Sequence, residues 1–188
     1  MKYLILVKHS LPEIIPSLPA RHWRLSDVGR MRCKPLAEAI AAYKPDFFVS
    51  SAEPKAVETA QAVTQHLDCA FEVVEGLHEH ERHHTAWESQ EQFEARVAEF
   101  FWHPQAPVFG NETAAQAEAR FSAALAGVLA EHPRKTLVVV AHGTVITLWV
   151  ARATGVEPFS FWKRLGLPSL VVLSLPDMAL ATVVETIP

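Results

Sequence analysis

The sequence of 188 residues contains only two cysteines, Cys33 and Cys69. This low number argues against a disulfide framework and predicts free thiols, so we expect a protein of the reducing cytoplasm. The sequence also lacks any apolar run that approaches the roughly 20 residues needed to span a bilayer. Only five apolar residues stand between Lys2 and Lys8, too few for the core of a signal peptide. These absences exclude a secreted disulfide scaffold and predict no membrane partner.

A strong excess of either charge is missing as well. The chain has 17 basic residues against 21 acidic residues, and its formal net charge is -4. This balance gives no reason to expect nucleic acid as a partner. Hydrophobic residues make up 49% and charged residues 20% of the chain, which is ordinary for one soluble domain with a substantial core. Any site for an anion must therefore be a local cluster of cations.

Two short apolar stretches, residues 3–7 and residues 136–141, run directly into histidines. Such stretches, rich in branched residues, are typical of strands that are buried on both faces. If the two strands are neighbours in a parallel sheet, both histidines emerge at its carboxyl edge, where open α/β sheets bind ligands. The residues at these two strand ends are Lys8, His9, Ser10, His142 and Gly143.

Strands and helices alternate along most of the chain. We expect further strands at about residues 46–51, 71–74, 169–175 and 179–185, and helices at about residues 27–43, 53–67, 91–102, 112–131 and 144–153. Pro35 lies inside the first helix and predicts a kink or a boundary there. This pattern predicts an α/β three-layer sandwich with a mainly parallel sheet, helices on both faces and a C-terminal antiparallel hairpin. We expect one domain over residues 1–188, with a lid-like excursion at about residues 80–111.

The strand ends carry the chemistry of a phosphate site. Lys8 and Lys55 supply positive charge, and the amino terminus of the helix that begins near Gly143 favours an anion. An imidazole among cations can attack phosphorus and form a phosphohistidine, which water then hydrolyses. Such a reaction needs a proton donor for the leaving alcohol, and Glu79 follows the third strand at a suitable place. No metal ion and no organic cofactor are required by this scheme.

Several segments resemble motifs of the histidine phosphatase superfamily, the phosphoglycerate mutase-like group. LVKHS stands where that family has Arg-His-Gly, and SSAEPKAVETA is similar to its Ser-Ser-x-x-x-Arg-Ala-x-x-Thr-Ala segment. GLHE, VVVAHGTVI and GNETAAQAEARF resemble its Leu-x-Glu, second histidine-glycine and Gly-Glu-Ser segments, in the same order. The resemblance implies that His9 is the phosphorylated nucleophile and Glu79 the proton donor. It also implies that His142, Lys8 and Lys55 line the phosphate pocket.

The chain departs from this pattern at three positions. Both pocket arginines of the family are replaced by lysine, at Lys8 and Lys55, and the glycine after the nucleophile is replaced by Ser10. Lysine keeps the charge but loses the planar fork that binds two phosphate oxygens. We therefore expect a weakened phosphate grip, and we expect Ser10 to narrow or re-aim the pocket.

The resulting hypothesis is a metal-independent phosphomonoesterase that acts on a small phosphorylated substrate. The alternatives are a phosphomutase and a degenerate relative that binds a phosphorylated ligand with little turnover.

Two residues, Glu79 and Glu81, are candidates for the role of proton donor. The histidines from His78 to His84 allow a zinc site, although a polar loop at the mouth of the pocket is the expected interpretation. The sequence gives neither the substrate nor the oligomeric state.

Overall fold

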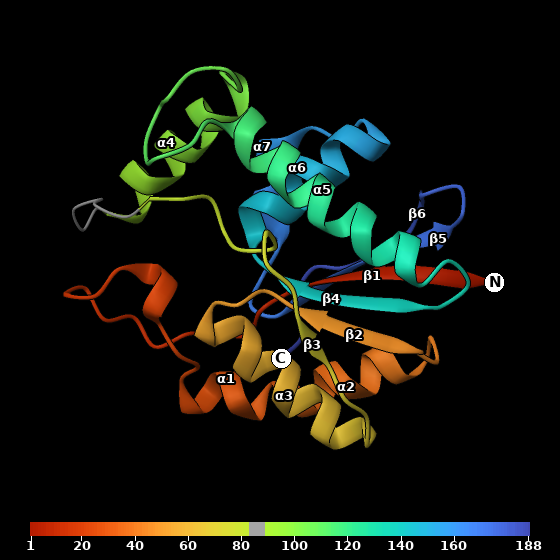
Figure 1. Ribbon diagram of the computed structural model, residues 1–188. Coiled ribbons are helices and arrows are strands. Elements are labelled where there is room, and N and C mark those ends of the chain that lie inside the picture. The colour runs from red at the N-terminus through yellow and green to blue at the C-terminus, as the bar shows by residue number, and fades with distance from the viewer. Residues whose placement is uncertain (83–88) are drawn as a thin grey trace.

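The computed structural model describes residues 1–82 and 89–188 (Figure 1). Within these residues one sheet contains β1 (Lys2–Lys8), β2 (Phe47–Ser50), β3 (Glu72–Val73), β4 (Leu137–Ala141), β5 (Ser169–Leu175) and β6 (Ala179–Val184). The helices are α1 (Asp27–Met31), α2 (Cys33–Ala41), α3 (Pro54–Leu67), α4 (Gln90–Trp102), α5 (Ala114–Glu131), α6 (Gly143–Thr154) and α7 (Pro158–Arg164), with one 3-10 turn, Ala20–His22.

The strand order in the sheet is β3-β2-β4-β1-β5-β6. β3, β2, β4 and β1 are parallel, whereas β5 is antiparallel to β1 and forms the C-terminal hairpin with β6. The two histidine-bearing strands are therefore direct parallel neighbours, and Lys8 lies opposite Ala141 in the register. The backbone N–H of His9 extends the ladder by donating to the Ala141 carbonyl at 3.0 Å. The predicted fold class is confirmed.

Alternating side chains of the strands build two separate cores. Leu4 and Leu6 of β1 face α4, α5, α6 and α7, whereas Ile5 and Val7 face α1, α2 and α3. All four side chains are fully buried. Successive residues of a strand point to opposite faces, so a continuous apolar strand requires helices on both sides. Figure 1 shows these two helical layers above and below the sheet.

Three local features differ from the sequence expectations or refine them. The helix expected at residues 27–43 divides at Arg32, because Pro35 lacks the N–H that would bond to the carbonyl of Met31. β3 has only two residues, and α7 forms in a segment for which no element was predicted. Within residues 80–111, α4 buries Val97 and Phe100 in the core that it shares with α5, α6 and α7. The lid-like role of the whole excursion stays a prediction.

Capping decides where α5 begins. Thr113 and Gln116 form a capping box, in which each side chain accepts a hydrogen bond from the backbone N–H of the other. The helix therefore starts at Ala114, two residues later than the sequence suggested. Glu112 stays outside the helix as a result, and its carboxylate is available to the loop beneath the pocket.

Replacing either of two glycines, Gly110 or Gly127, with alanine should change the free energy of unfolding in opposite directions. Gly110 has φ +90°, and a Cβ there would clash with the Glu81 carbonyl oxygen and lie 2.8 Å from His80 Nε2. We expect Gly110→Ala to lower the free energy of unfolding by roughly 2–4 kcal/mol, because strain and overpacking add. Gly127 lies inside α5 with nothing within 4 Å of a built Cβ. Gly127→Ala should therefore raise the free energy of unfolding by about 0.5–1 kcal/mol. Chemical denaturation of both variants checks the pair, and equal effects would contradict this account.

Candidate active site

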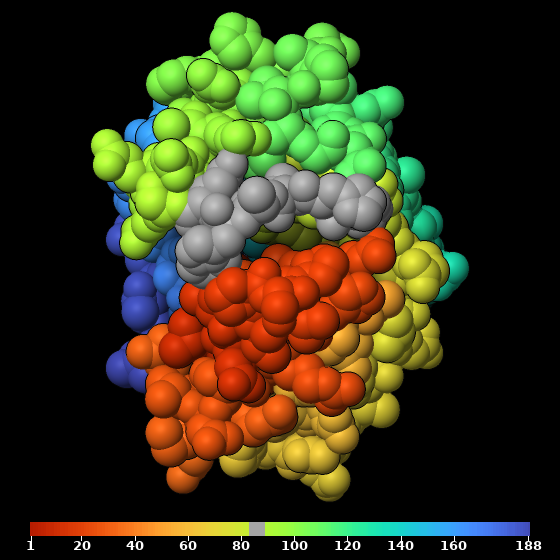
Figure 2. Space-filling view, turned by 90° about the vertical axis from the view of Figure 1, so that its left-hand side faces the viewer, coloured from red at the N-terminus to blue at the C-terminus, as the bar shows by residue number. Residues whose placement is uncertain are grey.

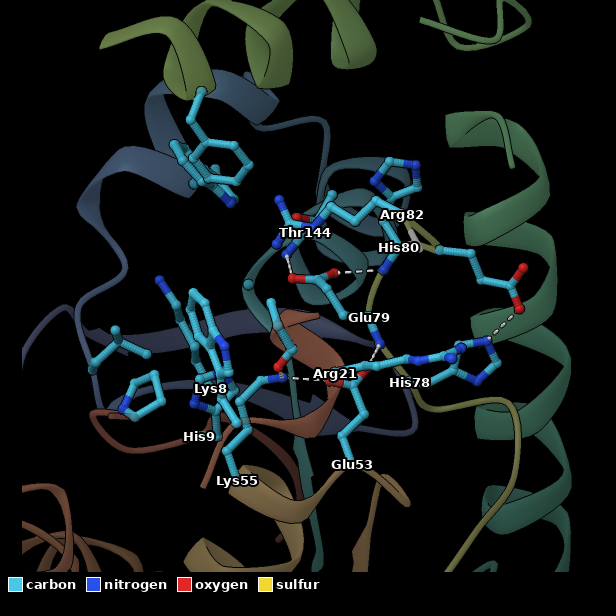
Figure 3. Close-up of a pocket in the computed structure, with 18 of the residues that line it drawn as sticks. Lys8, His9, Arg21, Glu53, Lys55, His78, Glu79, His80, Arg82 and Thr144 are labelled. Carbon is cyan, nitrogen blue, oxygen red and sulfur yellow. Dashed lines mark hydrogen bonds and ion pairs between the residues drawn. The ribbon is translucent and has the colours of Figure 1, made fainter. Parts of the chain in front are cut away.

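A cavity of about 410 Å³ opens at the carboxyl ends of β1, β2 and β4 (Figure 3). Its lining combines cations, carboxylates and aromatic rings from segments that are far apart in sequence. The loop after β1 contributes Trp23 and the segment after α3 contributes Glu79, while Phe93 and Trp162 come from α4 and α7. Figure 2 shows the N-terminal segment (red) and α4 (light green) on opposite halves of the same face. The cavity therefore lies where the two helical layers meet at the sheet edge.

The ring of His9 is oriented by its own backbone. His9 Nδ1 lies 2.7 Å from the carbonyl oxygen of Ser10, and a carbonyl only accepts, so Nδ1 carries the proton. The other ring nitrogen, Nε2, therefore has a free lone pair in the neutral imidazole. Burial, the charge of Lys55 and the neighbouring His142 ring hold the pKa of His9 well below its usual range. The cavity lining thus includes a neutral imidazole whose Nε2 is unprotonated.

His142 lies directly behind His9, as the sequence predicted. The two ring centroids are 5.2 Å apart with an interplanar angle of 61°. His142 Nε2 is hydrogen-bonded to Ser51 Oγ at 2.8 Å, and its buried Nδ1 has no partner among the described residues. Burial, and then the charge of Lys55, hold the pKa of His142 well below its usual range. His142 is fully buried and does not itself line the cavity, because the ring of His9 lies between them.

Lys8 and Lys55 both reach the cavity. Lys8 Nζ donates to the Leu165 carbonyl at 2.5 Å, and Lys55 Nζ donates to the Ala20 carbonyl at 2.8 Å. Burial lowers the pKa of Lys8 to about 8, against an opposing effect of the Glu79 charge. Gly143 makes room for Lys8, because a Cβ at position 143 would lie 3.0 Å from Lys8 Cε. The first lysine is therefore packed against the start of α6.

The carboxylate of Glu79 faces the amino terminus of α6. Its oxygens accept from the backbone N–H groups of Thr144 at 3.1 Å and Val145 at 3.3 Å, and from that of His80 at 2.9 Å. Burial pushes the pKa of Glu79 upward, but the neighbouring His142 and Arg82 side chains and these N–H donors lower it overall. The carboxylate is therefore ionised in the unliganded protein, and a phosphate dianion beside it would raise its affinity for a proton.

An arginine from α5 fixes the loop that carries Glu79. The Arg120 guanidinium donates to the carbonyls of Gly76, His78 and Glu79 at 2.8, 2.9 and 3.2 Å. Glu112 holds Arg120 in place at 2.5 Å and also accepts from the backbone N–H of Glu81. Sequence reasoning placed this segment in a motif without naming either residue. The three carbonyl contacts, to Gly76, His78 and Glu79, make the Glu79 loop a fixed part of the site.

Ser10 lies in a different place from the one expected. Its side chain is fully buried and donates to the Gly29 carbonyl at 2.7 Å, and its backbone N–H donates to Thr59 Oγ1. The side chain therefore ties the end of β1 to α1 and does not line the cavity. The expectation that Ser10 binds substrate and narrows the pocket finds no geometric basis, because its hydroxyl turns away from the pocket.

The histidines after β3 do not converge in the part that the structure describes. His78 Nε2 lies 3.3 Å from Glu81 Oε1, whereas His80 packs between Phe100 and Phe109 at ring distances of 4.1 and 4.8 Å. No group of three potential metal ligands occurs among the described residues. His83 and His84 lie outside them, so the zinc alternative is not tested at those positions.

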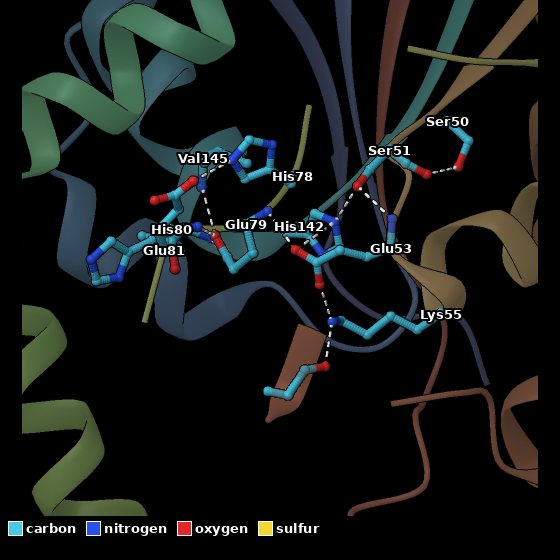
Figure 4. A network of polar contacts seen from close by, with 12 residues as sticks. Ser50, Ser51, Glu53, Lys55, His78, Glu79, His80, Glu81, His142 and Val145 are labelled. Carbon is cyan, nitrogen blue, oxygen red and sulfur yellow. Dashed lines mark hydrogen bonds and ion pairs between the residues drawn. The ribbon is translucent and has the colours of Figure 1, made fainter. Parts of the chain in front are cut away.

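Glu53 is a further site residue that the sequence analysis does not predict. It stands between the motif serines and Lys55, lines the cavity and forms a buried ion pair with Lys55 (Figure 4). The available signal was a carboxylate two residues before a lysine that the motif places in the pocket. Glu53 stands at the start of the predicted helix, where an acidic residue is common for structural reasons, so its position alone does not indicate a role in the site.

Comparison with known proteins supplies the family of this chain. The family model of the histidine phosphatase superfamily (branch 1) matches residues 20–183. A search of curated proteins finds no match. Among the described residues, no helix is both long and apolar enough to cross a membrane.

Solved structures of similar fold cover almost the whole chain. A mycobacterial glucosyl-3-phosphoglycerate phosphatase, in complex with VO3, has a TM-score of 0.77 at 21% identity and covers 98% of this chain and 99% of its own. A phosphoserine phosphatase from Entamoeba histolytica, bound to 3-phosphoglyceric acid, has a TM-score of 0.79 at 20% identity with 99% and 98% coverage. The YhfR protein of Bacillus stearothermophilus has a TM-score of 0.76 at 18% identity with 98% and 96% coverage.

Proposed function

Because this chain belongs to the histidine phosphatase superfamily (branch 1), we propose that it hydrolyses small phosphomonoesters through a phosphohistidine on His9, without a metal ion. Similar structures include phosphatases whose names refer to glucosyl-3-phosphoglycerate and phosphoserine, which supports a small phosphorylated substrate. The cations Lys8, Lys55 and Arg82 around the cavity supply the positive charge that a transferring phosphoryl group needs.

One observation carries this proposal: the hydrogen bond from His9 Nδ1 to the Ser10 carbonyl. It fixes the tautomer that leaves Nε2 free, and the depressed pKa of His9 keeps that nitrogen unprotonated at neutral pH. A histidine that served only as a polar surface group would need neither the fixed tautomer nor burial beside a second imidazole. His9 is therefore equipped as a nucleophile.

The two chemical steps follow from the positions of His9 and Glu79. First, the substrate dianion raises the proton affinity of Glu79, which takes up one proton from solvent as substrate binds. His9 Nε2 then forms a bond to phosphorus while the bond from phosphorus to the alcohol oxygen breaks, and protonated Glu79 gives its proton to that oxygen. Second, Glu79 accepts a proton from water, the water oxygen attacks phosphorus, and the bond to Nε2 breaks. The products are the alcohol and orthophosphate, and the enzyme returns to its starting state when orthophosphate leaves and Glu79 releases its proton to solvent.

The test is to trap the intermediate. Mixing the protein with 4-nitrophenyl phosphate and quenching in alkali should leave one phosphoryl group, stable to base and labile to acid, on the peptide that contains His9. His66→Ala, at an exposed position on α3, is the matched control and should still be labelled. A phosphoryl group on another residue, or turnover without labelling of His9, would contradict the proposed mechanism.

A second candidate is favoured by the state of the two lysines. Lys55 is already ion-paired with Glu53, and Lys8 already donates to a carbonyl, so both ammonium groups have partners before any ligand arrives. Such a site supports a binding protein with little turnover. The same quench separates the two candidates, because a binding protein would hold orthophosphate without becoming labelled. A phosphomutase would pass the group to a second substrate oxygen instead of water.

The lowered pKa of Lys8 predicts an alkaline limit to catalysis. A lysine with a lowered pKa is charged below that value and loses its charge as pH rises through about 8. We therefore expect kcat/KM, which reports groups of the free enzyme, to fall above about pH 8. Lys8→Arg should remove this limb, because a guanidinium stays charged. Lys34→Arg, at an exposed position on α2, should leave the profile unchanged. If kcat/KM of Lys8→Arg still falls above about pH 8, the group that titrates is a residue other than Lys8.

A further inference from the structure

Glu53 connects three candidate site residues from three different segments. Its Oε2 pairs with Lys55 Nζ on α3, and its Oε1 accepts from the backbone N–H of Glu79 at 2.8 Å. The same Oε1 lies 3.7 Å from His142 Nε2, at the end of β4. Figure 4 shows this carboxylate between Lys55 and His142. Its side chain is only 10% exposed, so water screens these interactions weakly.

The charges around the inner pocket cancel when Glu53 is included. The cavity lining carries four cations, Lys8, Arg21, Lys55 and Arg82, and four carboxylates, Glu53, Glu75, Glu79 and Glu81, while burial keeps His9 and His142 neutral. A phosphate dianion that approaches Lys55 therefore meets an ammonium that already has a counter-ion. Since like charges a few ångströms apart repel strongly in a poorly screened site, Glu53 must weaken the hold on phosphate.

We propose that Glu53 is a resident counter-ion of the phosphate pocket, which competes with phosphate for Lys55 and sets a low affinity for orthophosphate. The inference rests on the proposed function, because it assumes that phosphate occupies this cavity. A low affinity for the released product fits a hydrolase, since bound orthophosphate would block the next substrate. The Glu53 carboxylate also accepts a hydrogen bond from the backbone N–H of Glu79, so Glu53 is a positioning residue for the loop that carries Glu79.

Glu53→Gln isolates the charge from the shape. Glutamine has nearly the same size and keeps an oxygen that accepts from the Glu79 N–H, but it cannot neutralise Lys55. We expect orthophosphate, titrated by calorimetry, to bind roughly threefold to tenfold more tightly to the variant than to the native chain. A purely structural role predicts the opposite, because a disordered pocket binds phosphate more weakly. Glu53→Ser, which also removes the charge, provides a second variant with the same expected direction.

Glu58→Gln is the matched control. Glu58 lies on α3, one turn after Glu53; its side chain is 11% exposed and forms ion pairs with Arg24 and Arg30 at 2.9 Å, but it does not line the cavity. Both substitutions should lower the thermal midpoint, because each leaves a cation without its partner. Only the change at Glu53 should increase orthophosphate affinity.

The outcomes separate this inference from the proposed function. Unchanged or weaker orthophosphate binding in a folded Glu53 variant, or an equal gain in Glu58→Gln, would overturn the counter-ion role. The titration measures orthophosphate binding without turnover, so its result does not depend on whether His9 becomes phosphorylated. Tighter binding at Glu53→Gln without any phosphohistidine would support the counter-ion and reject the hydrolase.

Discussion

His9→Ala should reduce kcat/KM for 4-nitrophenyl phosphate by at least about a thousandfold, because no other group in the described cavity replaces its Nε2 as acceptor of the phosphoryl group. The lysines and the helix terminus would still bind the substrate, so KM should change much less than kcat. His66→Ala should keep the activity of the native chain. The measurement is steady-state kinetics on all three proteins.

Orthophosphate binding distinguishes loss of the nucleophile from loss of the fold. Calorimetry should show that His9→Ala still binds orthophosphate, because Lys8 and Lys55 are unchanged. Activity that survives in a folded His9→Ala protein would refute the nucleophile. No activity in either the variant or the native chain, with binding retained, would support the second candidate, a binding protein.

Glu79→Gln should cause the second large loss of activity. The size of the loss in kcat should depend on the leaving group. A general acid contributes about 10²–10⁴-fold when the leaving group needs a proton. We therefore expect a loss of this order in kcat for an alkyl phosphate such as glycerol phosphate. The loss should be much smaller for 4-nitrophenyl phosphate, because the phenolate leaves without protonation. Kinetics on both substrates check this difference.

Glu81→Gln is the control that assigns the acid. Glu81 also lines the cavity, and its carboxylate contacts His78 at 3.3 Å instead of the α6 amino terminus. We expect less than about a threefold effect from Glu81→Gln on either substrate. An equal loss on both substrates in Glu79→Gln would show that Glu79 positions the loop without transferring a proton. A large loss in Glu81→Gln would move the role to Glu81.

The sheet and the meeting of the two histidines could be predicted because both follow from local pattern. An uninterrupted apolar strand requires cover on both faces, and a strand that alternates with helices requires parallel neighbours. The carboxyl ends of such strands share one edge, which brings His9 and His142 to a ring distance of 5.2 Å. These inferences need only the order of residues along each strand.

The remaining contacts depend on tertiary geometry that no local pattern encodes. Ser10 turns toward Gly29 because the loop after β1 passes close to α1, and the sequence carries no sign of that approach. Arg120 reaches three carbonyls of a loop more than 40 residues away along the chain. Glu53 acquires its partners because β2, β3 and β4 end side by side. The catalytic roles themselves stay predictions until the variants are measured.

The strand order has a consequence for how the protein is made. β1 is synthesised before the other strands of the sheet, yet both of its neighbours, β4 and β5, come after β2, β3 and helices α1 to α5. The apolar stretch that leads to His9 therefore has no hydrogen-bonding partners until β4 and β5 have also been synthesised. We expect truncated nascent chains that lack β5 to be prone to aggregation and to be devoid of phosphate binding.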